Sequence, residues 1–166
     1  RGSVEVWSRG HRNPQGLARQ PGTGALFECE FGPRGGDEIN LIERGKNYGW
    51  PLVTLGREYH GPKIGVPHQD GMEDPIAFYV PSISPSGMSF YTGDRFPSWK
   101  GNLFLAALSG QHLRRVVLEG KRVVRQEALL SNLGWRFRNV RTGPGGLLYF
   151  STDEGKFARL APVLRP

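Results

Sequence analysis

Short apolar runs separated by turn residues dominate the hydrophobic pattern of this chain. Three of the runs have strand length, at 103–108, 113–118 and 147–151. Gly- and Pro-rich turns lie between such runs, for example at 35–37 and 143–146. No stretch shows a sustained helical period. The pattern therefore predicts an all-β protein.

A leucine followed by an aromatic residue recurs within this pattern, at positions 26, 103 and 148. Dividing the interval from the first to the last copy into three gives a unit of about 41 residues, and periods near 40–45 are typical of β-propeller blades. The chain is predicted to hold roughly three to four blades of a β-propeller. The unit expected near residue 65 is obscured by a loop-rich stretch from 31 to about 73.

An array of this size leaves a propeller open, because closed rings need about four to eight blades and open sheets expose unpaired edges. We therefore expect either another chain that completes the ring or a longer protein of which this is one portion.

Composition narrows the protein class further. With 24 Gly and 13 Pro in 166 residues, a helical bundle is disfavoured. An aromatic content of 11% and a hydrophobic content of 37% argue against disorder. No run of 18 apolar residues exists, so we expect no membrane span. The single Cys29 excludes a disulfide framework and a cysteine metal cluster within one chain.

The net charge of +7 raises the question of nucleic-acid binding. Of the 22 basic residues 17 are Arg, which suits recognition of planar anions. The charges are scattered, however, and the densest places, at 114–115 and 121–122, are only pairs. A solvated surface is the favoured interpretation, and we expect no nucleic-acid partner.

Two segments near the N-terminus carry candidate chemistry. Arg12, Asn13 and Gln15 bring planar polar groups together and suit a ligand rich in carboxylates and carbonyls; the alternative is a capped turn before a strand. The segment 31–38 joins a Gly-rich loop to Asp37 and Glu38, which suits a hard cation such as Ca²⁺; the alternative is a solvated turn.

Other polar residues give weaker indications. Alternation at 135–138 places Arg136 and Arg138 on one face of a strand, either to meet an anion or as exposed edge residues. The segment 46–51 is expected to form a tight turn held by aromatic packing. All four histidines are expected to have structural or surface roles, and no Gly-x-Ser-x-Gly motif supports a hydrolase.

Taken together, several strings resemble the glucose/sorbosone dehydrogenase family, especially its bacterial soluble aldose sugar dehydrogenases that use pyrroloquinoline quinone (PQQ). They occur in the family's order and cover nearly the whole chain: GHRNPQGLA at 10–18, FGPRGGDEINLI at 31–42, GKNYGWP at 45–51, PSGMSFYTGDRFPSW at 85–99, RFRNVRTGPGG at 136–146 and STDEG at 151–155. The resemblance implies a six-bladed propeller, of which residues 1–166 form the C-terminal portion of a single domain.

The resemblance also implies two kinds of site at one end of the propeller. PQQ contacts are expected at Arg12, Asn13, Gln15, Ala107, Arg136 and Arg138. Calcium ligands are expected at Gly32, Pro33, Asp37, Glu38 and Tyr48. In this scheme the carbonyls of Gly32 and Pro33 bind the Ca²⁺ ion that holds PQQ. Glu38 and the carbonyl of Tyr48 form a neighbouring Ca²⁺ site, with Asp37 as a further candidate.

The departures from the family pattern bear on activity. The family's catalytic base is a His of the N-terminal half, which these residues do not contain, and His11 is not that base. Some members place a PQQ-contacting Lys where this chain has Ser109. We therefore expect the chain by itself to be inactive.

The implied function is oxidation of an aldose at C1 to the lactone, with electrons passed to an acceptor. No secretory signal opens the chain, yet the resemblance implies a periplasmic or secreted protein. Two alternatives remain open at this point. One is a non-catalytic propeller module that binds a sugar or an anion, and the other is a basic nucleic-acid binder.

Overall fold

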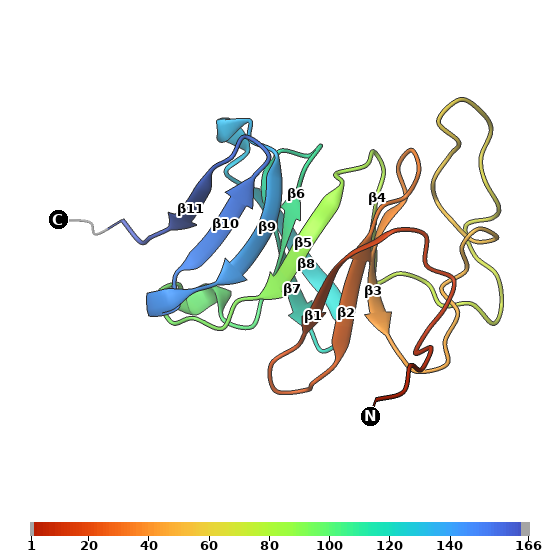
Figure 1. The fold of residues 1–166 in the computed structure, drawn as a ribbon, viewed down its shortest axis with the longest axis horizontal. Helices are drawn as coiled ribbons and strands as arrows, with labels where there is room; N and C mark the ends of the chain where they lie inside the picture. Colours follow the sequence, from red (N-terminus) through yellow and green to blue (C-terminus); the bar gives the residue numbers. More distant parts are fainter. Residues whose placement is uncertain (1, 164–166) are drawn as a thin grey trace.

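Strands form nearly all the regular structure of the protein in the computed structural model, which describes residues 2–163 (Figure 1). The first sheet contains β1 (Pro14–Arg19), β2 (Leu26–Glu30), β3 (Asp37–Ile42) and β4 (Ala77–Tyr79). The second contains β5 (Pro85–Phe90), β6 (Leu103–Ala107), β7 (His112–Glu119) and β8 (Arg122–Leu129). The third contains β9 (Phe137–Thr142), β10 (Leu148–Thr152) and β11 (Phe157–Leu160).

All strand pairs within these sheets are antiparallel, which confirms the all-β prediction. Short 3₁₀ turns occur at Pro97–Trp99, Ser131–Leu133 and Pro144–Gly146. In the described part of the chain, no helix has the length and apolar character that crossing a membrane requires. The number of blades in the whole protein and the closure of a ring stay predictions.

The leucine–aromatic repeat marks equivalent places in the three sheets, because Leu26, Leu103 and Leu148 each begin the second strand of a sheet. The unit expected near residue 65 was a wrong prediction. Residues 43–76 instead form an insertion between β3 and β4, two neighbouring strands of the first sheet. The insertion increases the number of residues in that sheet's segment of the chain and adds no further sheet. The loop-rich stretch expected from 31 to about 73 also begins too early, because β3 lies within it.

The sheets pack one after another, and β5 contacts both β1 and β9 (Figure 1). One core lies between the first and second sheets, and it includes Phe27, Met88 and Leu105. Another lies between the second and third sheets, and it includes Phe104 and Phe137. Both faces of β6 are thus buried, which explains the continuous apolar run at 103–108.

Two glycines allow the first strands to approach closely. A Cβ atom on Gly16 would lie 2.9 Å from Met88 Cγ on β5, and one on Gly87 would lie 3.0 Å from the Arg138 carbonyl oxygen on β9. The residues that begin each first strand therefore lie against those that begin the next, so β1, β5 and β9 all start at the same end of the molecule.

Each of these first strands carries a β-bulge at its start. Pro14 and Gly16 pair with consecutive residues of β2, so Gln15 is extra. Ser86 on β5 and Arg138 on β9 are extra in the same way. Bulges redirect side chains and are frequent beside functional sites. The structure thus aligns Gln15 and Arg138, both predicted ligand contacts, at equivalent positions.

Candidate functional site

The end at which β1, β5 and β9 begin gathers most of the predicted site residues. Gln15 and Arg138 occupy the bulges, and Ala107 pairs with Pro85 at the start of β5. The loop 31–36 follows β2 at this same end, because Glu30 pairs with Pro14. Positions far apart in the sequence therefore surround one region.

Arg12 is fixed against the Gly-rich loop. Its Nη1 donates hydrogen bonds to the carbonyl oxygens of Phe31 and Gly32, each at 3.1 Å. Its guanidinium also lies 5.2 Å from the centre of the Trp50 ring, a cation–π distance. The Gly32 carbonyl, a predicted calcium ligand, thus already accepts a charge-assisted hydrogen bond.

Asn13 and Gln15 lie side by side, as the alternation of an extended strand predicts. Gln15 Nε2 donates to Asn13 Oδ1 at 2.7 Å. The main-chain N–H groups of Arg12 and Asn13 donate to the Glu30 carboxylate, which holds this approach to β1 in place. The free amide groups of the pair are accessible, since Asn13 is exposed and Gln15 half-buried.

Arg136 and Arg138 converge on one carboxylate that sequence reasoning did not select. Arg136 Nε lies 3.2 Å from Asp153 Oδ2, and Arg138 Nε lies 2.8 Å from Asp153 Oδ1. The hydrogen bond from Arg138, followed by that from Arg136, lowers the pKa of Asp153. On the opposite face Phe137 is buried and Trp135 packs against the second core, as the alternation predicted.

Asp37 holds the loop rather than presenting free oxygen atoms. It is completely buried, and its Oδ1 accepts from the N–H of Gly32 at 3.0 Å. Its Oδ2 accepts from the Ser82 hydroxyl and from the N–H groups of Ile83 and Ser84. Four hydrogen bonds occupy this carboxylate, so we assign Asp37 to joining the Gly-rich loop to the turn before β5.

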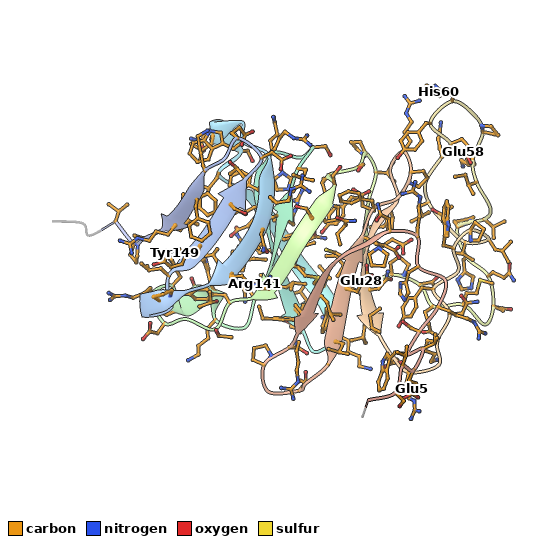
Figure 2. The ribbon with its side chains drawn as sticks, in the orientation of Figure 1. Glu5, Glu28, Glu58, His60, Arg141 and Tyr149 are labelled. Carbon is orange, nitrogen blue, oxygen red and sulfur yellow. The ribbon has the colours of Figure 1, made fainter. Side chains whose placement is uncertain are left out.

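Glu38 belongs to a buried acidic group on the first sheet, together with Glu30 and with Glu28, which is labelled in Figure 2. Burial raises the pKa of Glu38 to about 7, and burial followed by repulsion from Glu30 raises the pKa of Glu28 to about 9. Asn40 Nδ2 lies 3.2–3.3 Å from an oxygen of each carboxylate. The group is rich in acceptors and short of donors.

A small cavity adjoins this group. It holds about 10 Å³, room for roughly one water-sized particle, and Glu30, Gly32, Glu38 and Tyr48 are among its lining residues. Buried carboxylates and loop backbone around such a space provide the oxygen ligands that Ca²⁺ prefers. The donor set therefore fits a calcium ion at Glu38 and Tyr48.

A wider groove of about 690 Å³ runs beside the loop, between Pro33, the 80–84 turn and Ser109. Arg34 and Arg57 also line it, and both are exposed. Ser109 Oγ lies 2.8 Å from Ser84 Oγ. The volume lies within the range of small-molecule sites, and the two guanidinium groups suit a planar anion. None of the predicted PQQ contacts is among the residues that line this groove.

Sequence reasoning missed His11, Glu28 and Asn40 as well as Asp153. The signal for Glu28 and Glu30 was present, because Phe27-Glu28-Cys29-Glu30 alternates with period two and places both carboxylates on one face. His11 was expected to have a structural or surface role, and its Nδ1 lies 3.5 Å from Glu30 Oε1, a contact that the expectation did not include. No local spacing indicates that contact, which joins positions 19 residues apart.

Comparison with known proteins agrees with these features. The family model described as Glucose / Sorbosone dehydrogenase matches residues 1–160. Aldose sugar dehydrogenase YliI of Escherichia coli (strain K12) is 45% identical over 164 residues, which cover 96% of this chain and 44% of that protein. The chain thus spans less than half the length of this relative.

Solved structures show the same relation. A crystal structure of glucose dehydrogenase superposes with a TM-score of 0.91 at 50% identity, over 96% of this chain and 47% of that one. The PQQ-bound form of aldose sugar dehydrogenase (Adh) from Streptomyces coelicolor gives a TM-score of 0.71 at 31% identity, over 93% of this chain and 43% of that one. The chain therefore belongs to the glucose/sorbosone dehydrogenase family.

Proposed function

We propose that this chain contributes the PQQ- and calcium-binding part of a dehydrogenase that oxidises an aldose at C1 to the lactone. One observation carries the proposal: Gln15 and Arg138 occupy equivalent bulges at the end of the sheets where the Gly-rich loop also lies, and a groove of small-molecule size runs beside that loop. Family membership and the PQQ-bound relative support the choice of cofactor.

In this proposal the residues of the chain bind the cofactor and orient it. Arg136 and Arg138, held by Asp153, pair with the carboxylates of the cofactor. Arg12, Asn13, Gln15 and the backbone at Ala107 border it.

The metal ions take their ligands from the Gly-rich loop and from the acidic cavity. The carbonyls of Gly32 and Pro33 bind the Ca²⁺ that holds the cofactor, and Glu38 and Tyr48 bind a second Ca²⁺. The Gly32 carbonyl oxygen, which accepts a hydrogen bond from Arg12, would be one of the ligands of that metal ion. Asp37 positions this loop through its bonds to Gly32 and the 82–84 turn.

Bound PQQ supplies a quinone that takes up two electrons from the sugar C1 position. The proton of the C1 hydroxyl is taken by a His of the remaining part of the protein, so the 166 residues alone are inactive. By the same relationship, they form the C-terminal portion of one β-propeller in a periplasmic or secreted protein. The partners are the aldose, an electron acceptor and the chain segment that completes the propeller.

PQQ titration in the presence of Ca²⁺, followed by the absorbance of the cofactor, tests the binding role. We expect Arg138→Gln to weaken binding about tenfold to a hundredfold, since a hydrogen bond to a charged group contributes about 1.5–3 kcal/mol. Arg125→Gln is the matched control, because Arg125 is exposed on β8 and pairs with Glu127. Equal affinities of the two variants would contradict the role of Arg138.

Two further outcomes separate the alternatives. Absence of any PQQ-dependent absorbance change in the unmodified chain, with retained binding of a sugar or a simple anion, favours a non-catalytic module. Sugar-dependent dye reduction by the 166 residues with PQQ and Ca²⁺ contradicts the assignment of the base to another part of the protein.

A further inference from the structure

We propose that His11, Glu28 and Glu30 form a separate site for a first-row transition-metal dication, for which Zn²⁺ is the probe. The site differs from the proposed calcium sites in its ligands, because an imidazole nitrogen replaces backbone carbonyls. It does not depend on PQQ binding or on dehydrogenase activity.

The spacing of the three side chains suits one ion. His11 Nδ1 lies 3.5 Å from Glu30 Oε1 and 4.0 Å from Glu28 Oε2. One ligand atom from each residue lies within 4.8 Å of the others. Tetrahedral ligands about 2.0–2.2 Å from zinc are about 3.4 Å apart. A small inward movement of Glu28 therefore completes the geometry.

His11 is oriented as a metal-ligating histidine. Its Nε2 lies 2.8 Å from Ser8 Oγ, and its ring stacks on Tyr48 with 4.6 Å between ring centres. When Nε2–H donates to Ser8, Nδ1 directs its lone pair toward the two carboxylates. That Nδ1 atom is buried and has no hydrogen-bond partner.

Asn40 provides an independent indication that these carboxylates bind a cation. The residue is completely buried, and its NH₂ group faces three carboxylates although it has only two hydrogens to donate. Its own Oδ1 has no hydrogen-bond partner, and neither has Glu28 Oε1. Buried acceptors without partners are costly. Turning the amide over presents Oδ1 to the same space as a fourth ligand.

The local charge favours a cation, and the ligand atoms favour one that binds both nitrogen and oxygen. Within residues 2–163, His11 is the one basic side chain that lies within 4.0 Å of the Glu28 or Glu30 carboxylate. Glu30 Oε2 accepts from the N–H groups of Arg12 and Asn13, and Oε1 accepts from Asn40 Nδ2. Turning the Asn40 amide over therefore releases Oε1 for a metal. Imidazole suits zinc and its neighbours, whereas Ca²⁺ prefers an all-oxygen shell.

Isothermal titration of chelator-treated protein with Zn²⁺, in excess Ca²⁺, tests this site. We expect one zinc ion per chain in the presence of calcium. His11→Gln and Glu28→Gln should each weaken zinc affinity at least tenfold. Ser8→Ala leaves all three ligands in place and should weaken it about tenfold to a hundredfold, as loss of a partner behind a metal-binding His does.

His68→Gln is the matched control, because His68 lies 2.8 Å from Asp74 and 3.6 Å from Asp70 but is exposed. We expect it to bind zinc as the unmodified protein does. The proposal is wrong if no zinc binds in excess Ca²⁺, or if Ca²⁺ displaces zinc stoichiometrically. It is equally wrong if Ser8→Ala, with an unchanged near-ultraviolet circular dichroism spectrum, retains full affinity.

Discussion

Several polar side chains of this protein bind main-chain groups of distant segments. Asp37 joins the Gly-rich loop to the 82–84 turn, and the Ser86 hydroxyl lies 2.8 Å from the Arg138 carbonyl oxygen on the next sheet. His112 acts more locally, with Nδ1 2.7 Å from the Gly110 carbonyl oxygen. Single residues thus fix the loops at the end of the molecule where the candidate site lies.

His112 gives a prediction at the scale of one residue. Its side chain is buried, Nε2 has no hydrogen-bond partner, and burial lowers its pKa below the ordinary 6.5. The unfolded chain therefore takes up a proton more readily as the pH falls below about 6.5, so stability is lost on acidification.

The measurement is the free energy of unfolding by urea between about pH 7 and about pH 5. We expect His112→Gln to reduce the slope with pH by at most about 1.4 kcal/mol per pH unit, the value for one proton. His60→Gln, at an exposed position, is the control and should keep the original slope. Identical slopes in both variants would show that His112 contributes nothing to the pH dependence.

At the scale of the elements, local sequence patterns explain the individual strands well, but they explain less of how the strands are paired and grouped into sheets. The continuous apolar run of β6 follows from burial of both faces in apolar cores. The alternation in β2 separates an apolar face from a face that carries the buried carboxylates of Glu28 and Glu30. The bulges at Gln15, Ser86 and Arg138 could not be predicted, because a bulge depends on the register with a partner strand. The insertion at 43–76 misled the repeat count, since regular spacing was assumed where one sheet is interrupted.

The close approach of the first strands gives a prediction for β5. Gly87→Ala should destabilise the protein by about 1–3 kcal/mol, as overpacking does, because the new Cβ would meet Asn139 Oδ1 at 2.7 Å and β9 backbone at 3.0 Å. Gly16→Ala should cost less, since its two nearest atoms, Cys29 Sγ and Met88 Cγ, belong to side chains that can shift.

Chemical denaturation of these variants measures the difference. Gly2→Ala serves as the control, because no atom lies within 4 Å of its added Cβ, and it should change stability by less than about 0.5 kcal/mol. A Gly87→Ala variant as stable as Gly2→Ala is the result that rules out a tight β5–β9 contact.

For the whole molecule, the middle sheet is shared by two cores. Leu103 and Leu105 of β6 face the first sheet, and Phe104 and Ala106 face the third. Neither outer sheet contributes to both clusters. The described residues are therefore expected to unfold together, because loss of the middle sheet exposes both cores.

Paired core substitutions test this cooperativity. Phe27→Ala in the first core and Phe150→Ala in the second should each lower stability by about 3–5 kcal/mol. Tryptophan fluorescence and far-ultraviolet circular dichroism should report one coincident urea transition in both variants. Two separate transitions, with only one of them moved by Phe27→Ala, would instead show independent sheets.

The candidate site was predictable where its chemistry is local to one segment. Arg12, Asn13 and Gln15 were found from their spacing, as was the Gly-rich loop with its carboxylates. The partner Asp153 and the group around Asn40 were not found, because they depend on strand pairing and on contacts between distant segments. The structural role of Asp37 could not be predicted for the same reason, because its hydrogen bonds reach residues 45 to 47 positions away.

The three bulges have a consequence for how such proteins diverge. Equivalent positions carry an amide at Gln15, a hydroxyl at Ser86 and a guanidinium at Arg138. The Ser86 hydroxyl is buried against the Arg138 carbonyl, whereas Gln15 and Arg138 have accessible side-chain groups. Because a bulged residue lies outside the strand pairing, a substitution there alters the groups offered to a ligand or to the next sheet without altering the register. Ligand preference can therefore change one sheet at a time, which gives a set of similar sheets a physical route to new specificity within an unchanged fold.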